Sequence, residues 1–384
     1  MASLPSRPSI LLITRNFPPL TGGMERLLHQ AAEGLDDWAE LSIIGPNGCS
    51  AYAPPGCEVR EAPHSLAGFM LLSFWHVLMT CRRGRFQLIL GGSGLAAPAL
   101  WLARYLCGAH GAIFVHGLDI VVNNWAYQRL FLPAVRSADL VIANSANTRR
   151  LAIERGVAPE HITVINPGTE LPLLTELETP ANFREHHGVE FDQIILFVGR
   201  MTRRKGLSQF IEKSLPAILD AVPGAGLVVI GDDPVNSLNK LGEQDDVLAA
   251  VDKAGLEQKV RFLGAVEDSE LLAGYTAADV QIFPLVEVTG DVEGFGMVAI
   301  EAAACGTPTV AFDCGGVSDA ITTDNGTLVT ADDYEKFSTI VIELLKGSSP
   351  TPDSCRSHAE KYAWPHFHQK LATALQGCVS AFTR

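Results

Sequence analysis

The sequence predicts an α/β protein built from two doubly wound parallel sheets with helices on both faces. Short runs rich in β-branched residues and leucine alternate with longer helical patterns, which is typical of parallel α/β architecture. This alternation begins again at Ile194, after a polar stretch that contains proline. A chain of 384 residues is long enough for two such domains.

The two halves carry candidate strands of similar length. In the first half they are Ile10–Thr14, Leu41–Ile44, Gln87–Leu90, Ala112–Val115, Leu140–Ala143 and Thr163–Ile165. In the second half they are Ile194–Val198, Gly226–Ile230, Val260–Leu263, Val280–Phe283, Thr309–Ala311 and Thr327–Val329. We expect an N-terminal domain over residues 1–175, completed by a helix over 366–384, and a C-terminal domain over 190–365. Open sheets bind ligands beyond the carboxyl ends of their strands, so the expected site is the cleft between the two domains.

Composition excludes several classes of protein. With 47% hydrophobic and 19% charged residues the chain is an ordinary globular protein. A net charge of −14 argues against a protein that coats nucleic acid, although it does not exclude one local basic site for phosphate. The eight cysteines are scattered, without a Cys-x-x-Cys pair or a cluster of Cys and His. This favours reduced thiols in a cytoplasmic protein over disulfides or structural zinc.

Two carboxylates, Glu293 and Glu301, bracket a Gly-Phe-Gly loop that leads into a helix of small residues, and the pair Gly315-Gly316 follows. The amides at a helix N-terminus favour anions, and carboxylates accept hydrogen bonds from sugar hydroxyls. This pattern therefore suits an enzyme that holds a sugar nucleotide. The alternative is an ordinary turn before a helix, with two solvated acids.

A basic loop follows the strand Ile194–Val198 and ends at Gly206, before a predicted helix. It contains Arg200, Arg203, Arg204 and Lys205 in an otherwise acidic chain. A diphosphate at a helix N-terminus needs such neutralising groups, whereas a solvated basic loop is the alternative.

Two features of the first half belong to strand ends. His116 follows the strand Ala112–Val115, where a neutral imidazole can bind a sugar hydroxyl or act as a base, or is simply a structural histidine. Gly22-Gly23 permits close approach of a ligand, or forms a plain turn after two prolines. Gly92-Ser93-Gly94 fits a loose dinucleotide-binding pattern, but it follows the third strand and no acid ends the next one.

Together these motifs resemble the family 4 retaining glycosyltransferases, which have the GT-B fold of two Rossmann-like sheets facing across a cleft. The resemblance spans nearly the whole chain, from Phe17-Pro18-Pro19 and Gly22-Gly23 to Trp364. Its most specific part is the carboxylate pair combined with Gly199-Arg200 and Lys205-Gly206.

The resemblance implies a set of site residues. Arg200 and Lys205 would hold the donor diphosphate, Glu293 would contact the transferred sugar, and His116 would line the sugar pocket. The expected binding residues are Gly22 and Gly23 near the phosphates, Phe295, Gly296, Met297 and Val298 beside the sugar, Glu301 at the ribose, and Leu263, Gly264 and Val266 at the base.

The resemblance also implies same-face transfer, in which the departing diphosphate takes the acceptor's proton. We expect no cofactor and no metal ion, and the chain contains no Asp-x-Asp motif. The motifs are most similar to phosphatidylinositol-mannoside mannosyltransferases, which favours GDP-mannose as donor, with UDP-glucose or UDP-GlcNAc as alternatives. The expected acceptor is a lipid-linked or polysaccharide glycan.

Other classes stay open at this point. A GT-B epimerase would need further carboxylates near the sugar, a sugar phosphorylase would need a cofactor lysine or an added phosphate site, and the intact set of donor-site residues argues against a binding module without activity. Leu66–Cys81 is too short for the ~20 residues of a spanning helix. Leu66–Met79, with the basic end Arg82-Arg83-Gly84-Arg85 after it, predicts either a helix buried between two strands, which the strand that follows favours, or an interfacial amphipathic helix in peripheral contact with the inner face of the membrane.

Overall fold

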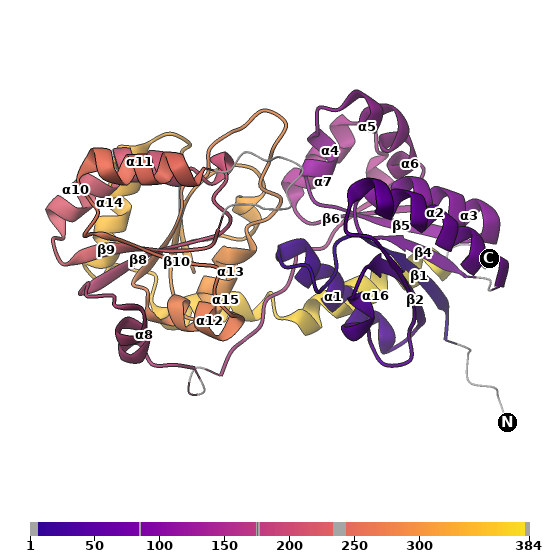
Figure 1. Ribbon diagram of the computed structural model, residues 1–384, viewed down its shortest axis with the longest axis horizontal. Coiled ribbons are helices and arrows are strands. Elements are labelled where there is room, and N and C mark those ends of the chain that lie inside the picture. The colour runs from indigo at the N-terminus through magenta and orange to yellow at the C-terminus, as the bar shows by residue number, and fades with distance from the viewer. Residues whose placement is uncertain (1–6, 84–85, 174, 176, 233–242, 381–384) are drawn as a thin grey trace. The chain divides into compact units, whose positions relative to one another are not determined.

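The computed structural model describes residues 7–83, 86–173, 175, 177–232 and 243–380, and it divides into two compact units (Figure 1). The first unit contains Met1–Gly168 and Trp364–Arg384, and the second contains Thr169–Ala363.

The unit boundary differs from the predicted one, which gave residues 169–175 to the first domain and Trp364-Pro365 to the second. Thr169 belongs to the second unit because its amide donates to the Tyr362 carbonyl at 2.8 Å and it bridges to Ala363. Trp364 belongs to the first unit because its ring lies against Gly168, where a Cβ would come within 2.4 Å of it.

The first unit is built on a seven-stranded parallel sheet of order β3-β2-β1-β4-β5-β6-β7. Its strands are β1 (Ser9–Ile13), β2 (Glu40–Pro46), β3 (Glu58–Ala62), β4 (Leu88–Gly91), β5 (His110–Val115), β6 (Leu140–Ala143) and β7 (Ile162–Val164). The predicted strands are confirmed within one or two residues, but β3 was missed. It is an edge strand whose sequence, EVREA, is mostly charged and buries little more than Ala62, so its pattern lacks an apolar run.

The second unit is built on a six-stranded parallel sheet of order β10-β9-β8-β11-β12-β13, the same winding as in the first. Its strands are β8 (Gln193–Val198), β9 (Ala225–Ile230), β10 (Val260–Gly264), β11 (Val280–Phe283), β12 (Thr309–Phe312) and β13 (Gly326–Val329). All six were predicted. In both sheets the direction of winding reverses beside the first strand, between β1 and β4 and between β8 and β11, and ligands bind at such points.

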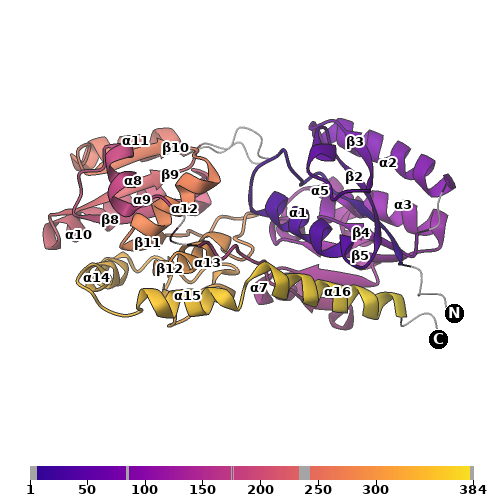
Figure 2. The same ribbon diagram turned by 90° about the horizontal axis from the view of Figure 1, so that it is seen from below.

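Helices cover both faces of the first sheet. They are α1 (Gly23–Asp36), α2 (Leu66–Arg83), α3 (Ala97–Cys107), α4 (Leu118–Val121), α5 (Trp125–Leu130), α6 (Leu132–Arg136), α7 (Ala146–Glu154) and α16 (Trp364–Ser380). Leu11 and Ile13 of β1 face a core shared with α2, α3, α6 and α7. The C-terminal helix α16, drawn in yellow, packs beside α1 and completes the opposite face (Figure 2).

The helices of the second unit are α8 (Pro180–His187), α9 (Leu207–Lys213), α10 (Leu215–Ala221), α11 (Gln244–Ala254), α12 (Asp268–Ala277), α13 (Met297–Ala304), α14 (Tyr334–Leu345) and α15 (Pro352–Glu360). Strand β8 shows how the two faces are filled. Ile195 and Phe197 face a core with α9, α10, α11 and α14. Ile194, Leu196 and Val198 face the opposite core, with α8, α12 and α13. Alternate residues of a strand point to opposite faces, so this apolar strand is buried on both.

Helix α2 packs against the sheet with one side and leaves apolar side chains exposed on the other. Phe69 and Val77 are buried against the sheet, while Leu71 and Trp75 are exposed. Gly84 and Arg85, which belonged to the predicted basic end, lie outside the described residues. Within the described part of the chain, we find no helix that combines the length and apolar character needed to cross a membrane.

Candidate functional site

The main candidate site lies where the winding of the second sheet reverses. The basic loop leaves the carboxyl end of β8, and the segment that leads to Glu293 leaves the neighbouring β11. Gly206 brings the two together, since a Cβ there would come within 2.0 Å of the Pro284 carbonyl oxygen. Its φ of 66° also suits glycine, and the Val286 amide donates to the Arg204 carbonyl at 2.9 Å.

Three charged side chains meet at this point. The Lys205 ammonium lies 2.9 Å from Glu293 Oε2, and the Arg204 guanidinium donates to the same oxygen. Arg204 also donates from Nε to Asp291 Oδ1 at 3.2 Å. The side chains of Lys205, Arg204 and Glu293 are only 11%, 12% and 14% exposed. The charges are therefore largely removed from water and balance one another.

Burial and pairing shift the pKa values in this cluster. Burial alone would raise the pKa of Glu293, but Arg204 and Lys205 outweigh it and lower that pKa to about 2. Burial lowers the pKa of Lys205 to about 8, despite the opposing effect of Glu293. For Arg204 burial acts to lower the pKa, whereas Glu293 and Asp291 reverse this and raise it. Glu293 and Arg204 are thus ionised at neutral pH, and Lys205 titrates just above it.

Neighbouring groups hold the cluster in place. The Lys205 ammonium lies 4.4 Å from the centroid of the Phe283 ring, a cation–π contact. Gly316 donates its amide to the Glu293 carbonyl at 2.8 Å. A Cβ on Gly315 would come within 2.6 Å of that carbonyl oxygen, so the glycine pair allows this close approach.

Helix α13 carries the second carboxylate. Gly296 forms its N-cap with a φ of 96° and no side-chain cap, and Phe295 is buried while Met297 and Val298 are half-buried. Glu301 is buried little more than one turn further along, where the Tyr275 hydroxyl donates to its Oε2 at 3.1 Å. A carboxylate oriented in this way can accept hydrogen bonds from vicinal hydroxyls.

The predicted base segment lies at the end of β10. Leu263, Gly264 and Val266 are half-buried, and Ala265 donates its amide to Asp232 Oδ2 at 3.0 Å. Asp232, exposed at the end of β9, also lies beside Gly264, where a Cβ would be 3.3 Å from Oδ1. The segment therefore has a carboxylate next to it.

Sequence reasoning missed several of these residues. Arg204 and Asp291 complete the ion cluster, while Arg200 is exposed. Arg204 and Asp291 lie in or beside segments that the sequence motifs identify, but only the folded structure shows which cation pairs with which acid. Tyr275 and Asp232 follow no recognisable motif.

In the first unit, the predicted residues lie at the carboxyl ends of β1 and β5. Gly22 and Gly23 are exposed at the start of α1, where Gly22 is the N-cap. A Cβ on Gly22 would come 2.5 Å from Glu25 Oε2, and Asn16 donates to the other oxygen of Glu25 at 2.7 Å.

His116 is buried, and its Nε2 donates to the Gly92 carbonyl at 2.8 Å. In the neutral ring the proton therefore resides on Nε2, and Nδ1 is an acceptor for a hydroxyl. Asp119 joins the two loops because Oδ1 accepts from the His116 amide at 2.8 Å and Oδ2 accepts from the Gly94 amide at 2.9 Å.

Gly92 and Gly94, which fit the loose dinucleotide-binding pattern, allow close packing. A Cβ on Gly92 would come within 2.5 Å of Thr14 and Leu28, and one on Gly94 within 2.1 Å of the Tyr127 hydroxyl. Near these loops Ser93 Oγ, Tyr127 Oη and Asn144 Oδ1 are buried without a hydrogen-bond partner in the described structure. Unpaired buried polar atoms are costly, so this end of the sheet suits a polar ligand.

The fold and the site define a two-domain protein with a buried cluster of charged side chains at a sheet end, and comparison with known proteins identifies its class. Residues 21–171 match the model of Glycosyltransferase Family 4, and residues 192–347 match that of Glycosyl transferases group 1. The D-inositol 3-phosphate glycosyltransferase of Corynebacterium jeikeium is 30% identical over 338 residues, which are 82% of this chain and 78% of the relative. The GDP-mannose-dependent alpha-(1-6)-phosphatidylinositol monomannoside mannosyltransferase of Mycolicibacterium smegmatis is 28% identical over 363 residues, 88% of this chain and 89% of the relative.

Solved structures show the same fold. The Anabaena protein HepE in complex with UDP superposes with a TM-score of 0.76 at 22% identity, covering 96% of this chain and 100% of that one. The chain belongs to the family 4 glycosyltransferases, in the GT-B fold class. It is an enzyme that acts on a nucleotide sugar.

The buried ion cluster generates a prediction about stability. We expect Glu293→Gln to lower the free energy of unfolding by about 3–5 kcal/mol, because it leaves two buried cations without their main counter-charge. Glu212→Gln is the matched control: it breaks an exposed 2.8 Å pair with Lys253 and should cost at most about 1 kcal/mol.

Urea unfolding followed by circular dichroism measures both changes. The pKa of Glu293 is lowered from 4.5 to about 2, so its contribution is complete above pH 4.5 and is lost as the pH falls toward 2. The difference between wild type and Glu293→Gln should shrink over that interval. A pH-independent difference, or equal losses in the two variants, would contradict the account.

Proposed function

We propose that the protein is a retaining hexosyltransferase that moves mannose from GDP-mannose to a lipid-linked or polysaccharide glycan. The observation that carries this proposal is the buried cluster of Lys205, Arg204 and Glu293 at the reversal point of the second sheet. It combines cations suited to a departing diphosphate with a carboxylate suited to sugar hydroxyls.

In the proposed reaction the bond between the sugar C1 and the donor diphosphate breaks, and C1 bonds to the acceptor oxygen on the same face. The acceptor's proton passes to the departing diphosphate, so no protein base is needed. Lys205, with Arg200 from the exposed part of the loop, stabilises the charge that develops on the phosphate oxygen. Catalysis then depends on positioning and on preorganised charge, and we propose that it needs no metal ion or other cofactor.

The other predicted residues would bind the donor. Glu293, the amides of Phe295, Gly296 and Met297, and Val298 would surround the sugar, and Glu301 would accept from the ribose hydroxyls. Gly22, Gly23 and His116 of the first unit would complete the phosphate and sugar contacts. His116 suits this role because its Nδ1 is left as an acceptor by the bond from Nε2 to Gly92.

Asp232 supports guanine as the donor base. A carboxylate beside the segment Leu263–Val266 can accept from both N1–H and the exocyclic amine of guanine, whereas uracil offers a single donor on its ring. The Mycolicibacterium relative is named as GDP-mannose-dependent. The UDP bound to HepE supports the alternative, a UDP-glucose or UDP-GlcNAc donor.

The acceptor proposal rests on the first unit and on the relatives. The names of both curated relatives include an inositol carrying phosphate or a phosphatidyl group, which suggests a polyol phosphate as the acceptor core. The unpartnered polar atoms of Ser93, Tyr127 and Asn144 suit hydroxyl groups. Leu71, Trp75, Trp101 and Tyr105 are exposed on the packed helices α2 and α3, which supports loose contact with a membrane that carries the acceptor.

Donor hydrolysis and transfer test the function directly. Incubation with GDP-mannose, UDP-glucose and UDP-GlcNAc, with D-inositol 3-phosphate or phosphatidylinositol mannoside as acceptor, should give transfer from GDP-mannose with retention of anomeric configuration by NMR. Turnover should be unchanged in excess EDTA. Transfer from UDP-sugars alone would replace the donor, inversion would overturn the mechanism, and loss on chelation restored by Mg²⁺ would overturn metal independence.

Asp232 provides a test of base recognition. We expect Asp232→Asn to raise the KM for GDP-mannose about 10-fold or more, because a charge-assisted contact to the base is lost. Binding of UDP, measured by calorimetry, should weaken less. If Asp232→Asn weakens the binding of GDP-mannose and of UDP equally, Asp232 does not distinguish guanine from uracil.

Lys205 provides the pH dependence. Because its pKa is lowered to about 8, kcat/KM for the donor should fall as the pH rises above 8 and the ammonium loses its proton. Lys205→Arg keeps a charge throughout this range and should lose the alkaline decline. Lys205→Ala should lower kcat, because the activation barrier should rise by about 2–4 kcal/mol. Arg203→Ala, which changes an exposed cation of the same loop, is the control. An alkaline decline that persists in Lys205→Arg would assign it to another group.

Glu301 provides a test of ribose binding. We expect Glu301→Gln to weaken nucleoside diphosphate binding by about 1.5–3 kcal/mol, because the ribose hydroxyls lose a charged acceptor. A 2′,3′-dideoxy nucleotide should lose little, and calorimetry with both ligands measures the difference. Tyr275→Phe, which removes the hydroxyl that orients Glu301, should have a smaller effect. Equal losses for the two nucleotides would rule out the ribose contact.

A further inference from the structure

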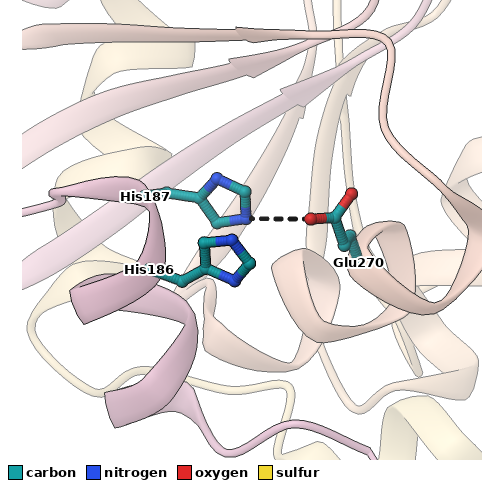
Figure 3. Close-up of side chains that lie close together, drawn as sticks. All are labelled: His186, His187 and Glu270. Atoms are coloured by element: carbon teal, nitrogen blue, oxygen red, sulfur yellow. Dashed lines mark ion pairs between the residues drawn. The ribbon is translucent and has the colours of Figure 1, made fainter.

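A second cluster of side chains lies in the second unit, between helices α8 and α12 (Figure 3). His186 and His187 end α8, and Glu270 lies in the first turn of α12. The two helices pack closely, since Phe183 is fully buried and a Cβ on Gly274 would come within 3.4 Å of its ring. The facing positions of His187 and Glu270 are therefore set by a packed interface, and His186 lies beside them with its side chain 62% exposed.

The polar atoms of this cluster face one another without bonding. His187 Nε2 lies 3.8 Å from Glu270 Oε1, which is too long for a hydrogen bond. That nitrogen is buried and has no hydrogen-bond partner within the described ranges of the chain. The carboxylate is oriented by its other oxygen, Oε2, which accepts from the Glu267 amide at 3.3 Å. One donor atom from each of the three residues lies within 4.8 Å of the others.

The imidazole rings of His186 and His187 also point in the same direction. Consecutive residues of a helix normally point apart, yet these rings stack at 4.7 Å with an angle of 7° between their planes. Figure 3 shows both rings extending from the end of α8 toward Glu270. Phe183 packs against the ring of His187 at 4.6 Å and limits its rotation.

We propose that His186, His187 and Glu270 bind a divalent transition-metal ion, and that the ion is zinc. Two imidazoles and one carboxylate, with a water molecule in the fourth position, form a common zinc donor set. In a tetrahedral zinc site, bond lengths of about 2.1 Å place ligand atoms about 3.4 Å apart. The 3.8 Å gap between His187 and Glu270 closes to that value with a small side-chain rotation.

More acidic than basic residues surround the cluster, and this favours a bound cation. Glu178 lies 3.9 Å from His186 Nδ1, and Glu267 and Asp268 begin the same turn as Glu270. The opposing charges are Arg261, whose Nε donates to the His187 carbonyl at 2.9 Å, and Arg184 in the last turn of α8. Together with Glu270, these acids outnumber the two cations.

Such an ion would join the end of α8 to the first turn of α12. Helix α12 directly follows the segment Leu263–Val266 and carries Tyr275, which orients Glu301. The ion would therefore stabilise the frame of the second unit without touching the reacting groups. Zinc binding does not depend on the identity of the donor, so its test is independent of the proposed function.

The test uses the full chain, stripped of metal with a chelator and titrated with ZnSO₄ in a calorimeter. One zinc ion should bind per chain with a Kd in the micromolar range or below. At 100 times that Kd, the thermal midpoint of the second unit should rise by roughly 5–10 °C. His187→Gln and Glu270→Gln should each weaken binding at least about 10-fold, and the control His366→Gln, an exposed histidine on α16, should leave it unchanged.

Cobalt distinguishes this site from the cysteines of the chain. Co²⁺ should give the visible absorption of a four-coordinate nitrogen and oxygen site, without a thiolate charge-transfer band. Because Glu270 is partly exposed, Glu270→Gln remains informative if His187→Gln fails to fold. Absence of stoichiometric binding, a thiolate band, or equal affinity in wild type, His187→Gln and Glu270→Gln would overturn the proposal.

Discussion

The buried contact of Glu293 with Lys205 and Arg204 is the constraint on which the proposed donor site depends. A buried cation loses its hydration and stays charged only beside an anion. Glu293 supplies that anion for both cations, and Asp291 supplies a second for Arg204. The cluster is nearly neutral in the folded protein. An entering diphosphate would then replace Glu293 as a partner of these cations. Before it binds, neither Lys205 nor Arg204 is an uncompensated buried charge.

The backbone around this cluster is as constrained as its charges. Gly206 places the basic loop against Pro284, and Gly315 places the following turn against Glu293, and neither position has room for a Cβ. Both glycines have positive φ, at 66° and 68°. Contacts between main-chain segments therefore fix the Cα positions of the charged residues, which limits where their side chains can lie. Such fixed main-chain positions would give the proposed reaction the preorganised charge that electrostatic catalysis requires.

Much of this could be predicted from the sequence, because strand runs and glycine-bearing turns are local. The strand pattern, the repeat of the winding, and the segments around Lys205 and Glu293 all follow from residues close together in the chain. The edge strand β3 could not be predicted, since its charged sequence carries no apolar pattern. The partnership of Arg204 with Glu293 and of Tyr275 with Glu301 could not be predicted either, because each joins segments that meet only in the folded sheet. The same holds for His187 and Glu270, where adjacent histidines are visible but their acid is not.

Helix α12 links these features of the second unit. Its N-terminal end follows the segment beside Asp232, its first turn carries Glu270, and its last turns carry Tyr275. Phe183 packs on its middle at Gly274, a position that allows close contact with α8. A helix is stiff over ten residues, so a shift at one end moves the other. Any contact that holds α8 against α12, whether apolar packing at Phe183 or an ion at His187 and Glu270, therefore also fixes the position from which Tyr275 orients Glu301.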